Sequence, residues 1–385
     1  MTLPTVTLLA SLDPLLRERA IAAARSHDPF LVVVRHELTT LPIDDTVHRR
    51  VEGPDRHEDV ALPVEGGCCL SCLLREDTLS ILADLEDRHV LLVLPPAVEP
   101  ASAAIALHEH DAAHLAAIAT AVDLSTLEGR LWDEAALADL EDLGDDPRSQ
   151  AEVLVRQLGH SDLVLHSDGA ARARALAGAL SGLQPQRLVD DPAWITVGRH
   201  DGEAFVAGLQ AGTPACRGGV GAHGVEQRCW HRRRPLHPGR LLEVIEGGQL
   251  TGLVRAQGWL WVATRPGTVL ELDAVGESFE LAAVDAWLDA VSDHSGAHPT
   301  RRDHATRRWD PYYGDRAQDL SLTVLDGDID EVTRLLDACM LTDAELAEGP
   351  EVWRTWPDPM APWLGDEDEL LATNRTTDTE VRREA

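Results

Sequence analysis

The first half of the chain begins with residues 5–35, TVTLLASLDPLLRERAIAAARSHDPFLVVVR. Apolar and β-branched residues predict strands at Thr5–Ala10 and Phe30–Arg35. Between them, Leu15, Ile21 and Ala22 recur at helical spacing, which predicts a helix over Pro14–Ser26. A strand, a helix and a second strand in this order are typical of a parallel βαβ unit. The stretch therefore predicts an α/β fold.

The same alternation continues to residue 198. Further apolar runs occur at Val90–Leu94, Ile118–Asp123 and Leu163–His166, with Ala- and Leu-rich helical stretches between them. Runs of this kind are typical of a mostly parallel sheet that is covered by helices on both faces. We therefore expect residues 1–198 to form one α/β domain.

A different pattern follows. Residues 199–226 are Gly-rich and weakly periodic, which predicts a linker. Residues 227–348 are expected to form a smaller α+β domain, with strands at 228–233, 259–263, 278–282 and 320–325 and helices at 237–247, 283–292 and 328–339. In residues 349–385, we expect the Trp- and Pro-rich segment Trp353–Trp363 to pack back on this domain or to form a binding strap. The acidic, polar tail after it is expected to be disordered.

The composition excludes several classes of function. The chain has no lysine, its 34 basic residues are all arginine, and Asn374 is its only asparagine. A net charge of −32 disfavours direct nucleic-acid binding and favours basic proteins or metal cations, although an acidic surface also serves solubility alone. No segment predicts a signal peptide or a membrane span, and six cysteines in 385 residues are not a disulfide framework. We expect a cytoplasmic protein with reduced thiols and no membrane partner.

Four ordered motifs within 110 residues carry a family resemblance. They are RPLHPGRL at 234–241, GWLWVATRP at 258–266, WDPYYGDRAQ at 309–318 and LDACMLTD at 336–343. Together they resemble the C-terminal domain of the CobW family, a group of metal-homeostasis GTPases. The resemblance implies a P-loop-GTPase-like first domain followed by a CobW C-terminal α+β domain.

The nucleotide motifs of that family are missing from the first half. A Gly-rich phosphate loop with Lys and Thr or Ser should follow the first strand, where the chain has Ser11-Leu12-Asp13-Pro14. The acidic strand end of the family corresponds to Val93, and its guanine-reading Asn-Lys-x-Asp corresponds to residues 166–169, HSDG. We therefore expect a degenerate nucleotide site, no catalytic residues, and no GTP binding or hydrolysis by the usual mechanism.

A cysteine loop resembles the metal-binding Cys-x-Cys-Cys motif of the family. Cys68, Cys69 and Cys72 are candidate zinc ligands, and His57 or Glu65 could supply the fourth ligand that zinc requires. The alternative is a vestigial loop whose cysteines pack as small apolar groups.

Other polar clusters have ordinary structural explanations. His108, His110 and His114 are expected on a helix, where His110 and His114 would share a face as a weak metal site or as a plain polar face. The arginines at 232–234, 301–302 and 307–308 could contact RNA phosphates or acidic partners, or form intramolecular ion pairs. Cys339 is expected in the core. Trp259 and Trp261 share one side of a strand and are expected in the core, with a partner surface as the alternative.

Within the family, the chain most resembles an actinobacterial subgroup that recruits a ribosome hibernation factor. The resemblance rests on Cys69-x-Ser71-Cys72, the degenerate phosphate loop and the retained C-terminal motifs. It implies a scaffold that brings a hibernation factor to the small ribosomal subunit when zinc is scarce. The alternatives are a zinc-allocation metallochaperone with residual GTP-dependent switching, and a pseudo-GTPase that is the structural partner of a functional paralogue.

Overall fold

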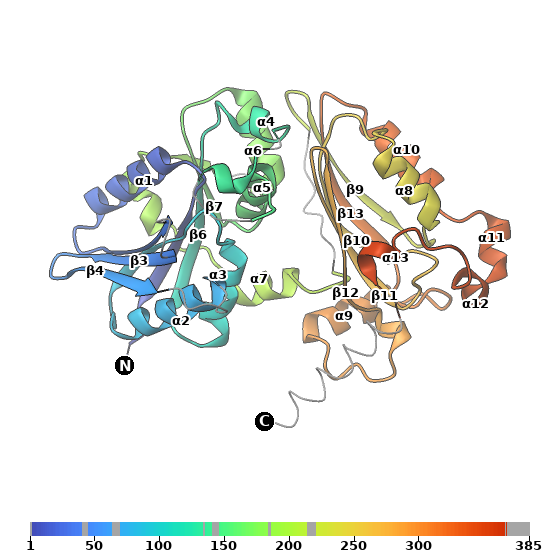
Figure 1. The fold of residues 1–385 in the computed structure, drawn as a ribbon, viewed down its shortest axis with the longest axis horizontal. Coiled ribbons are helices and arrows are strands. Elements are labelled where there is room, and N and C mark those ends of the chain that lie inside the picture. Colours follow the sequence, from blue (N-terminus) through green and yellow to red (C-terminus); the bar gives the residue numbers. More distant parts are fainter. Residues whose placement is uncertain are drawn as a thin grey trace. The chain divides into compact units, whose positions relative to one another are not determined.

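The computed structural model describes residues 2–40, 45–63, 70–133, 135–140, 146–183, 186–213, 221–365 and 367. The chain divides into two units, Met1–Gly202 and Glu203–Ala385. They are coloured blue to green and green to red in Figure 1.

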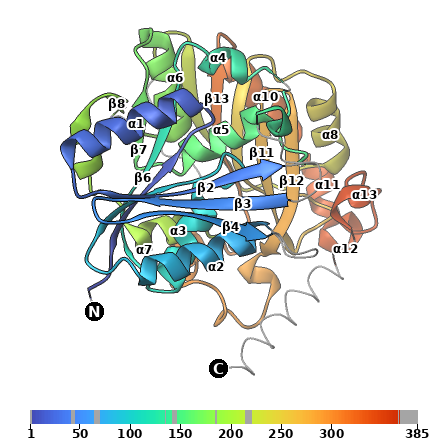
Figure 2. The same cartoon turned by 60° about the vertical axis from the view of Figure 1, so that its left-hand side comes forward.

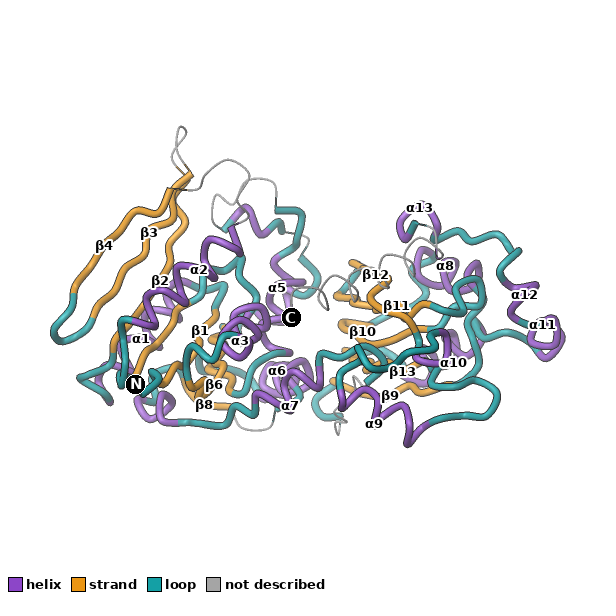
Figure 3. Tube along the Cα trace, turned by 90° about the horizontal axis from the view of Figure 1, so that it is seen from below, coloured by secondary structure: helices purple, strands orange, loops and turns teal. Residues whose placement is uncertain are grey.

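Unit 1 is built on a mixed sheet, within the part of the chain that the structure describes. Its eight strands have the order β4-β3-β2-β5-β1-β6-β7-β8. All pairs from β2 to β8 are parallel, whereas β3 and β4 form an antiparallel hairpin that extends the sheet beyond β2 (Figure 3). The strands are β1 (Thr5–Ala10), β2 (Val32–Thr40), β3 (Asp45–Glu52), β4 (His57–Pro63), β5 (His89–Val93), β6 (His114–Val122), β7 (Leu163–His166) and β8 (Gln186–Leu188).

Helices cover both faces of this sheet. On one face, α1 and the 3-10 turn η2 pack against alternate strand residues such as Leu9, Leu91 and Leu165. Figure 2 shows α2 and α3 on the opposite face. The helical elements of unit 1 are α1 (Pro14–His27), α2 (Leu70–Ala83), α3 (Pro100–Glu109), α4 (Leu127–Arg130), η1 (Leu137–Asp139), α5 (Gln150–Gly159), α6 (Ala171–Ser181) and η2 (Pro192–Thr196).

Unit 2 is built on an antiparallel sheet with the strand order β12-β11-β10-β13-β9. One face is covered by α8 and α10 and buries a large aliphatic core (Figure 1). The other carries a smaller core that is rich in tryptophan, with Trp259, Trp261, Trp287 and Trp353. The strands are β9 (Val225–Arg232), β10 (Leu253–Leu260), β11 (Thr268–Val275), β12 (Ser278–Ala286) and β13 (Gln318–Leu325). The helices are α7 (Gly202–Gly208), α8 (Pro238–Glu246), η3 (Leu288–Ala290), α9 (Pro299–Arg308), α10 (Ile329–Ala338), α11 (Asp343–Glu348), α12 (Pro350–Trp353) and α13 (Ala361–Leu364).

The predicted fold class is confirmed: a mostly parallel α/β sheet is followed by a smaller α+β unit. The helix predicted at 283–292 is wrong, because β12 runs to Ala286 and pairs with β11, and only the short turn η3 follows it. Sheet pairing has overridden the helical preference of this Ala-rich stretch. Strand β11 and helix α9 were not expected from the sequence.

The remaining expectations meet the structure in different ways. The segment predicted as a linker contains α7 and the first residues of β9. Trp353 is buried and Met360 lies in the aliphatic core, so the Trp- and Pro-rich segment packs back on unit 2 as expected. The predicted disordered tail lies largely outside the described residues.

Cys229 is disulfide-bonded, which corrects the expectation of reduced thiols. The number of cysteines in a sequence does not reveal which thiols folding brings together. No helix among the described residues is long and apolar enough to cross a membrane.

Candidate functional site

The carboxyl ends of the parallel strands in unit 1 are the first candidate site. In open α/β sheets, ligands bind in the crevice outside these strand ends, next to the point where the strand order reverses. Here β1 lies between β5 and β6, so the loop after β1 occupies that point. In this loop the Ser11 hydroxyl donates to the carbonyl oxygen of Ala121 at 2.8 Å, which ties the loop to β6.

The N-terminus of α1 has no free N–H group to offer an anion. Pro14 has no N–H, and the amides of Leu15 and Leu16 donate to Asp13 Oδ1 at 2.9 and 3.0 Å. The amide of Arg17 donates to the carbonyl oxygen of Asp13 at 3.0 Å. A helix N-terminus normally binds phosphate through these groups. In this chain they are taken, and a carboxylate occupies the position of the anion.

The end of β6 forms a second closed network. Asp123 Oδ1 accepts hydrogen bonds from the Ser125 amide at 2.9 Å and from the Ser125 and Ser167 hydroxyls at 2.8 Å each. Burial by itself would raise the pKa of the Asp123 carboxyl, but these hydrogen bonds outweigh it and the pKa is lowered. Ser167 also accepts from the amide of Leu124 at 3.0 Å, so the loops after β6 and β7 are joined to each other.

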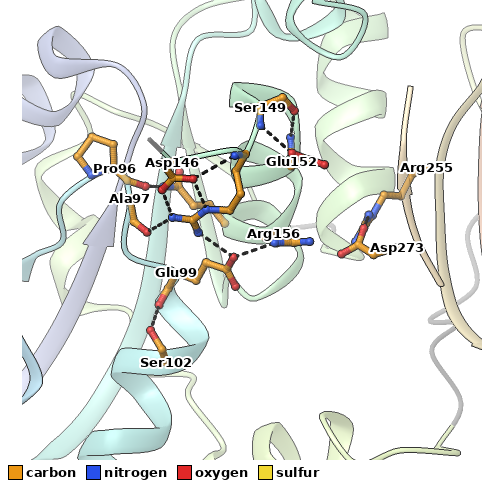
Figure 4. Close-up of polar contacts among 12 residues, drawn as sticks. Pro96, Ala97, Glu99, Ser102, Asp146, Ser149, Glu152, Arg156, Arg255 and Asp273 are labelled. Atoms are coloured by element: carbon orange, nitrogen blue, oxygen red, sulfur yellow. Dashed lines mark hydrogen bonds and ion pairs between the residues drawn. The ribbon is translucent and has the colours of Figure 1, made fainter. Parts of the chain in front are cut away.

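Two arginines, Arg148 and Arg156, contact the loop that follows β5 (Figure 4). Arg148 donates to both carboxylate oxygens of Asp146, to Glu99 Oε1 at 3.2 Å and to the carbonyl oxygen of Ala97 at 2.8 Å. Arg156 reaches the same Glu99 oxygen at 3.1 Å. The hydrogen bond to Asp146 raises the pKa of Arg148, so its guanidinium remains charged. The two arginines therefore hold the start of α3 in place through internal ion pairs.

The second candidate site is a cavity of about 160 Å³ between α2, α3 and the sheet. Its walls are mainly aliphatic, with Leu79, Leu92 and Ile105 among them. Three side chains that can bind metals also line it: Cys72, near the start of α2, His36, in the middle of β2, and Glu109, at the end of α3. Cys72 is a half-buried thiol that forms no disulfide.

His36 is held by a buried charged network. Its Nε2 lies 2.8 Å from Asp77 Oδ2, and Arg49 donates to Asp77 Oδ1 at 2.5 Å. The His36 side chain is 2 % exposed and that of Asp77 is 9 % exposed. A carboxylate on one ring nitrogen fixes the imidazole orientation and makes the other nitrogen a better metal ligand. The network is thus of the kind that supports a metal-binding histidine.

The structure places only part of the predicted zinc site. Cys68, Cys69 and Glu65 lie outside the described residues, whereas Cys72 lines the cavity. His57 pairs with Glu52 at the start of β4. Among the described residues, no group of three or more His, Cys, Asp or Glu side chains could hold a metal ion.

The expectation for the three histidines is wrong in one respect. His108 lies in the last turn of α3, His110 caps that helix and His114 begins β6, so His110 and His114 do not share a helical face. Asp111 between them adopts a positive φ of 46°, which turns the chain into the strand.

His36 was missed by the sequence reasoning. The predicted strand ended at Arg35, one residue before His36, whereas β2 continues to Thr40. Strand alternation extended by one residue would have placed His36 on the face opposite Val33 and Arg35. Its partner Asp77 lies 41 residues further along the chain, and no local pattern connects the two.

The C-terminal motifs are joined by ion pairs. Arg232 binds Asp337 through two 2.8 Å contacts, Arg234 binds Asp343 at 2.8 Å, and Arg240 binds Glu345 at 2.8 Å. In the second arginine group, Arg301 pairs with Asp285 and Arg308 with Asp319. The structure therefore supports intramolecular ion pairs for these arginines. Cys339, Trp259 and Trp261 are buried as predicted.

The comparison with known families identifies the domain in unit 2. Residues 225–340 match the cobalamin synthesis protein CobW C-terminal domain. Unit 2 therefore contains a CobW C-terminal domain, and the resemblance seen in its four motifs is confirmed.

Over most of its length, the chain is also similar to zinc-related proteins. It is 29 % identical over 329 residues to a zinc chaperone of Mycobacterium tuberculosis, covering 77 % of this chain and 79 % of the relative. It is 23 % identical over 362 residues to zinc-regulated GTPase metalloprotein activator 1 of Dictyostelium discoideum, covering 81 % and 72 %. The crystal structure of Zn(II)-bound YjiA GTPase from E. coli matches over 89 % of this chain and 100 % of that chain, at 12 % identity and a TM-score of 0.33. The two sequence relatives make the chain homologous to a zinc chaperone and to a zinc-regulated GTPase metalloprotein activator.

Proposed function

We propose that this protein binds zinc as a cargo and passes it to another protein, with Cys72 among the ligands. The observation that carries the proposal is that Cys72 and His36 line the same cavity in unit 1. The names of the relatives, a zinc chaperone and a zinc-regulated metalloprotein activator, support the same assignment.

The residues at this site have the chemistry for a transferable ion. Thiolate and imidazole are common zinc ligands, and a site with fewer than four protein ligands keeps a position open for an incoming ligand. Asp77 holds His36 at Nε2, so Nδ1 is the nitrogen left for the metal. Transfer would proceed when a ligand of the recipient takes the open position.

A zinc-binding assay tests the proposal. Competition with a chromophoric chelator should show one site of high affinity in the full chain, and Cys72→Ser should weaken it at least about tenfold, since one thiolate ligand is lost. Cys339→Ala is the matched control, because Cys339 is buried in the core of unit 2. Equal zinc affinities for wild type and Cys72→Ser would contradict the proposal.

We further propose that zinc handling here does not use GTP. The amides of Leu15 and Leu16 are bound to Asp13, and the chain contains no lysine to hold phosphates. Calorimetry with GTP and Mg²⁺ should show no saturable heat. A micromolar dissociation constant that is abolished by Arg19→Ala or by another change near α1 would instead support residual GTP-dependent switching.

A second candidate is recruitment of a ribosome hibernation factor to the small ribosomal subunit. It is favoured by the net charge of −32, which suits a basic, ribosome-binding partner and not RNA itself. The complex should then form at low salt and weaken as salt rises. Absence of a hibernation factor or of ribosomal subunits from pull-downs at low and physiological salt would count against this candidate and leave the zinc proposal untouched.

A further inference from the structure

A small basic cavity in unit 2 is not accounted for by zinc handling. It has a volume of about 20 Å³ and lies between α9, the tryptophan face of the sheet and the Ala211–Gly212 turn. One face of α9 contributes Arg301, His304 and Arg308, which are three and four residues apart.

The walls of this cavity carry more basic than acidic side chains. Arg233, Arg301 and Arg308 line the cavity together with two carboxylates, Asp315 and Asp319, and Asp285 pairs with Arg301 from outside it. Asp315 already accepts the amides of Leu288 and Asp289 at 2.9 Å each. Asp319 is engaged by Arg308 at 2.9 Å and by His231 at 3.2 Å. Both carboxylates are therefore committed to other groups.

Arg233 is the guanidinium with the least compensation. Within the described residues, its guanidinium donates to the backbone carbonyl oxygens of Gly314, Arg316 and Arg308. Burial and then the nearby charge of Arg308 lower the pKa of Arg233, although it remains protonated near neutral pH. A half-buried cation bound only to neutral oxygens provides positive potential for an anion.

Two further donors on the walls have no acceptor among the described residues. They are the indole N–H of Trp287 and the Nε–H of Arg301, whose residues are 2 % and 5 % exposed. The two terminal nitrogens of Arg301 donate to Asp285 and to the carbonyl oxygen of Ala286, so Nε–H is the group that remains for another acceptor. An unpaired buried donor costs about 1–3 kcal/mol, so an acceptor at this place would stabilise the fold.

We propose that this cavity binds one small anion, either a halide or one oxygen of a carboxylate or phosphate. Arg233 supplies most of the attraction, and the α9 face forms the opposite wall. The volume exceeds the roughly 10–15 Å³ that one water-sized particle requires, and it excludes a larger group. The anion would tie α9 to the segment after β9.

The first test locates the ion directly. Crystals of the full chain soaked in sodium bromide should show an anomalous scattering peak beside Arg233. A cavity that contains only ordered water after separate soaks in sodium bromide, sodium acetate and sodium phosphate would overturn the proposal whatever the behaviour of any variant.

The second test measures the response in solution. Chloride, acetate and phosphate are each compared with gluconate at constant ionic strength, and the thermal unfolding midpoint of the full chain is followed. We expect a saturable rise with at least one of the small anions, and a requirement for at least about tenfold more anion in Arg233→Gln, since the main attraction is lost. Arg307→Gln, on the exposed side of α9, is the matched control and should respond like wild type. The same response in Arg233→Gln and in wild type would refute the site.

Discussion

A single carboxylate closes the N-terminus of α1. Asp13 follows β1, caps the helix with its side chain and uses the amides that would otherwise bind an anion. Any ligand phosphate at this place would have to displace the cap and approach a like charge. Two features of unit 1 therefore oppose nucleotide binding: the Asp13 cap on α1 and the absence of lysine.

Removal of this cap should destabilise the protein. Asp13→Ala is expected to cost about 1 kcal/mol of unfolding free energy, because the amides of Leu15 and Leu16 lose their acceptor. Asp13→Asn keeps an oxygen at the same position and should cost much less. Urea unfolding of both variants measures the difference, and equal stability of Asp13→Ala and wild type would contradict the capping role.

Cys72 and Cys339, neither of which forms a disulfide, should differ in reactivity. Burial raises the pKa of the Cys339 thiol to about 11, whereas Cys72 is half-buried at the edge of a cavity. Because the thiolate is the nucleophile, iodoacetamide at about pH 8 should modify Cys72 and spare Cys339 in the folded protein. Mass spectrometry after a timed reaction checks this, with guanidinium-unfolded protein as the control in which both react. Rapid native labelling of Cys339 would show that it is accessible.

At the scale of elements, the motif LDACMLTD ends at the start of α11, and an ion pair joins α11 to α8. Thr342 and Glu345 form a capping box at the start of α11, and Arg240 of α8 binds Glu345. The hydrogen bond from Arg240 is the main reason that the pKa of the Glu345 carboxyl falls to about 2. Two motifs that are about a hundred residues apart in the sequence are thereby joined.

This pair should make stability depend on pH. A carboxyl with a lowered folded-state pKa stabilises the protein above its unfolded pKa, and the stabilisation is lost as the pH falls from about 5 to about 2. Glu345→Gln should therefore be less stable than wild type near pH 7, and the gap should shrink in this acid range. Unfolding free energies of both proteins at several pH values test this, and a constant gap would contradict the assigned cause.

At the scale of the whole molecule, each of the three core clusters described lies within one unit. The cluster beneath α1 belongs to unit 1, and the aliphatic and tryptophan clusters belong to unit 2. The C-terminal segment completes unit 2: Trp353, Met360 and Leu364 are buried, and Arg265 binds Asp358 at 2.7 Å.

Unit 2 should therefore depend on its last residues. A fragment of residues 203–385 is expected to unfold in one cooperative transition, whereas the same fragment ending at residue 348 should lose much of its stability. Loss of one buried tryptophan alone costs about 3–5 kcal/mol. Circular dichroism during thermal unfolding compares the two fragments, and similar midpoints would show that the segment is dispensable.

The sequence alone determined the features that depend on local periodicity and composition. Alternating apolar runs predicted the parallel strands β1, β5 and β7, and the motifs predicted the C-terminal domain, because neighbouring residues already carry these signals. Only the tertiary structure decided which side chains meet. Examples are Cys72 and His36 around one cavity, and Arg233 beside Arg308. The extension of β12 through residues expected to be helical also depended on its pairing with β11. Such contacts join residues far apart in the chain, so their free energy exists only once the sheets and helices have packed.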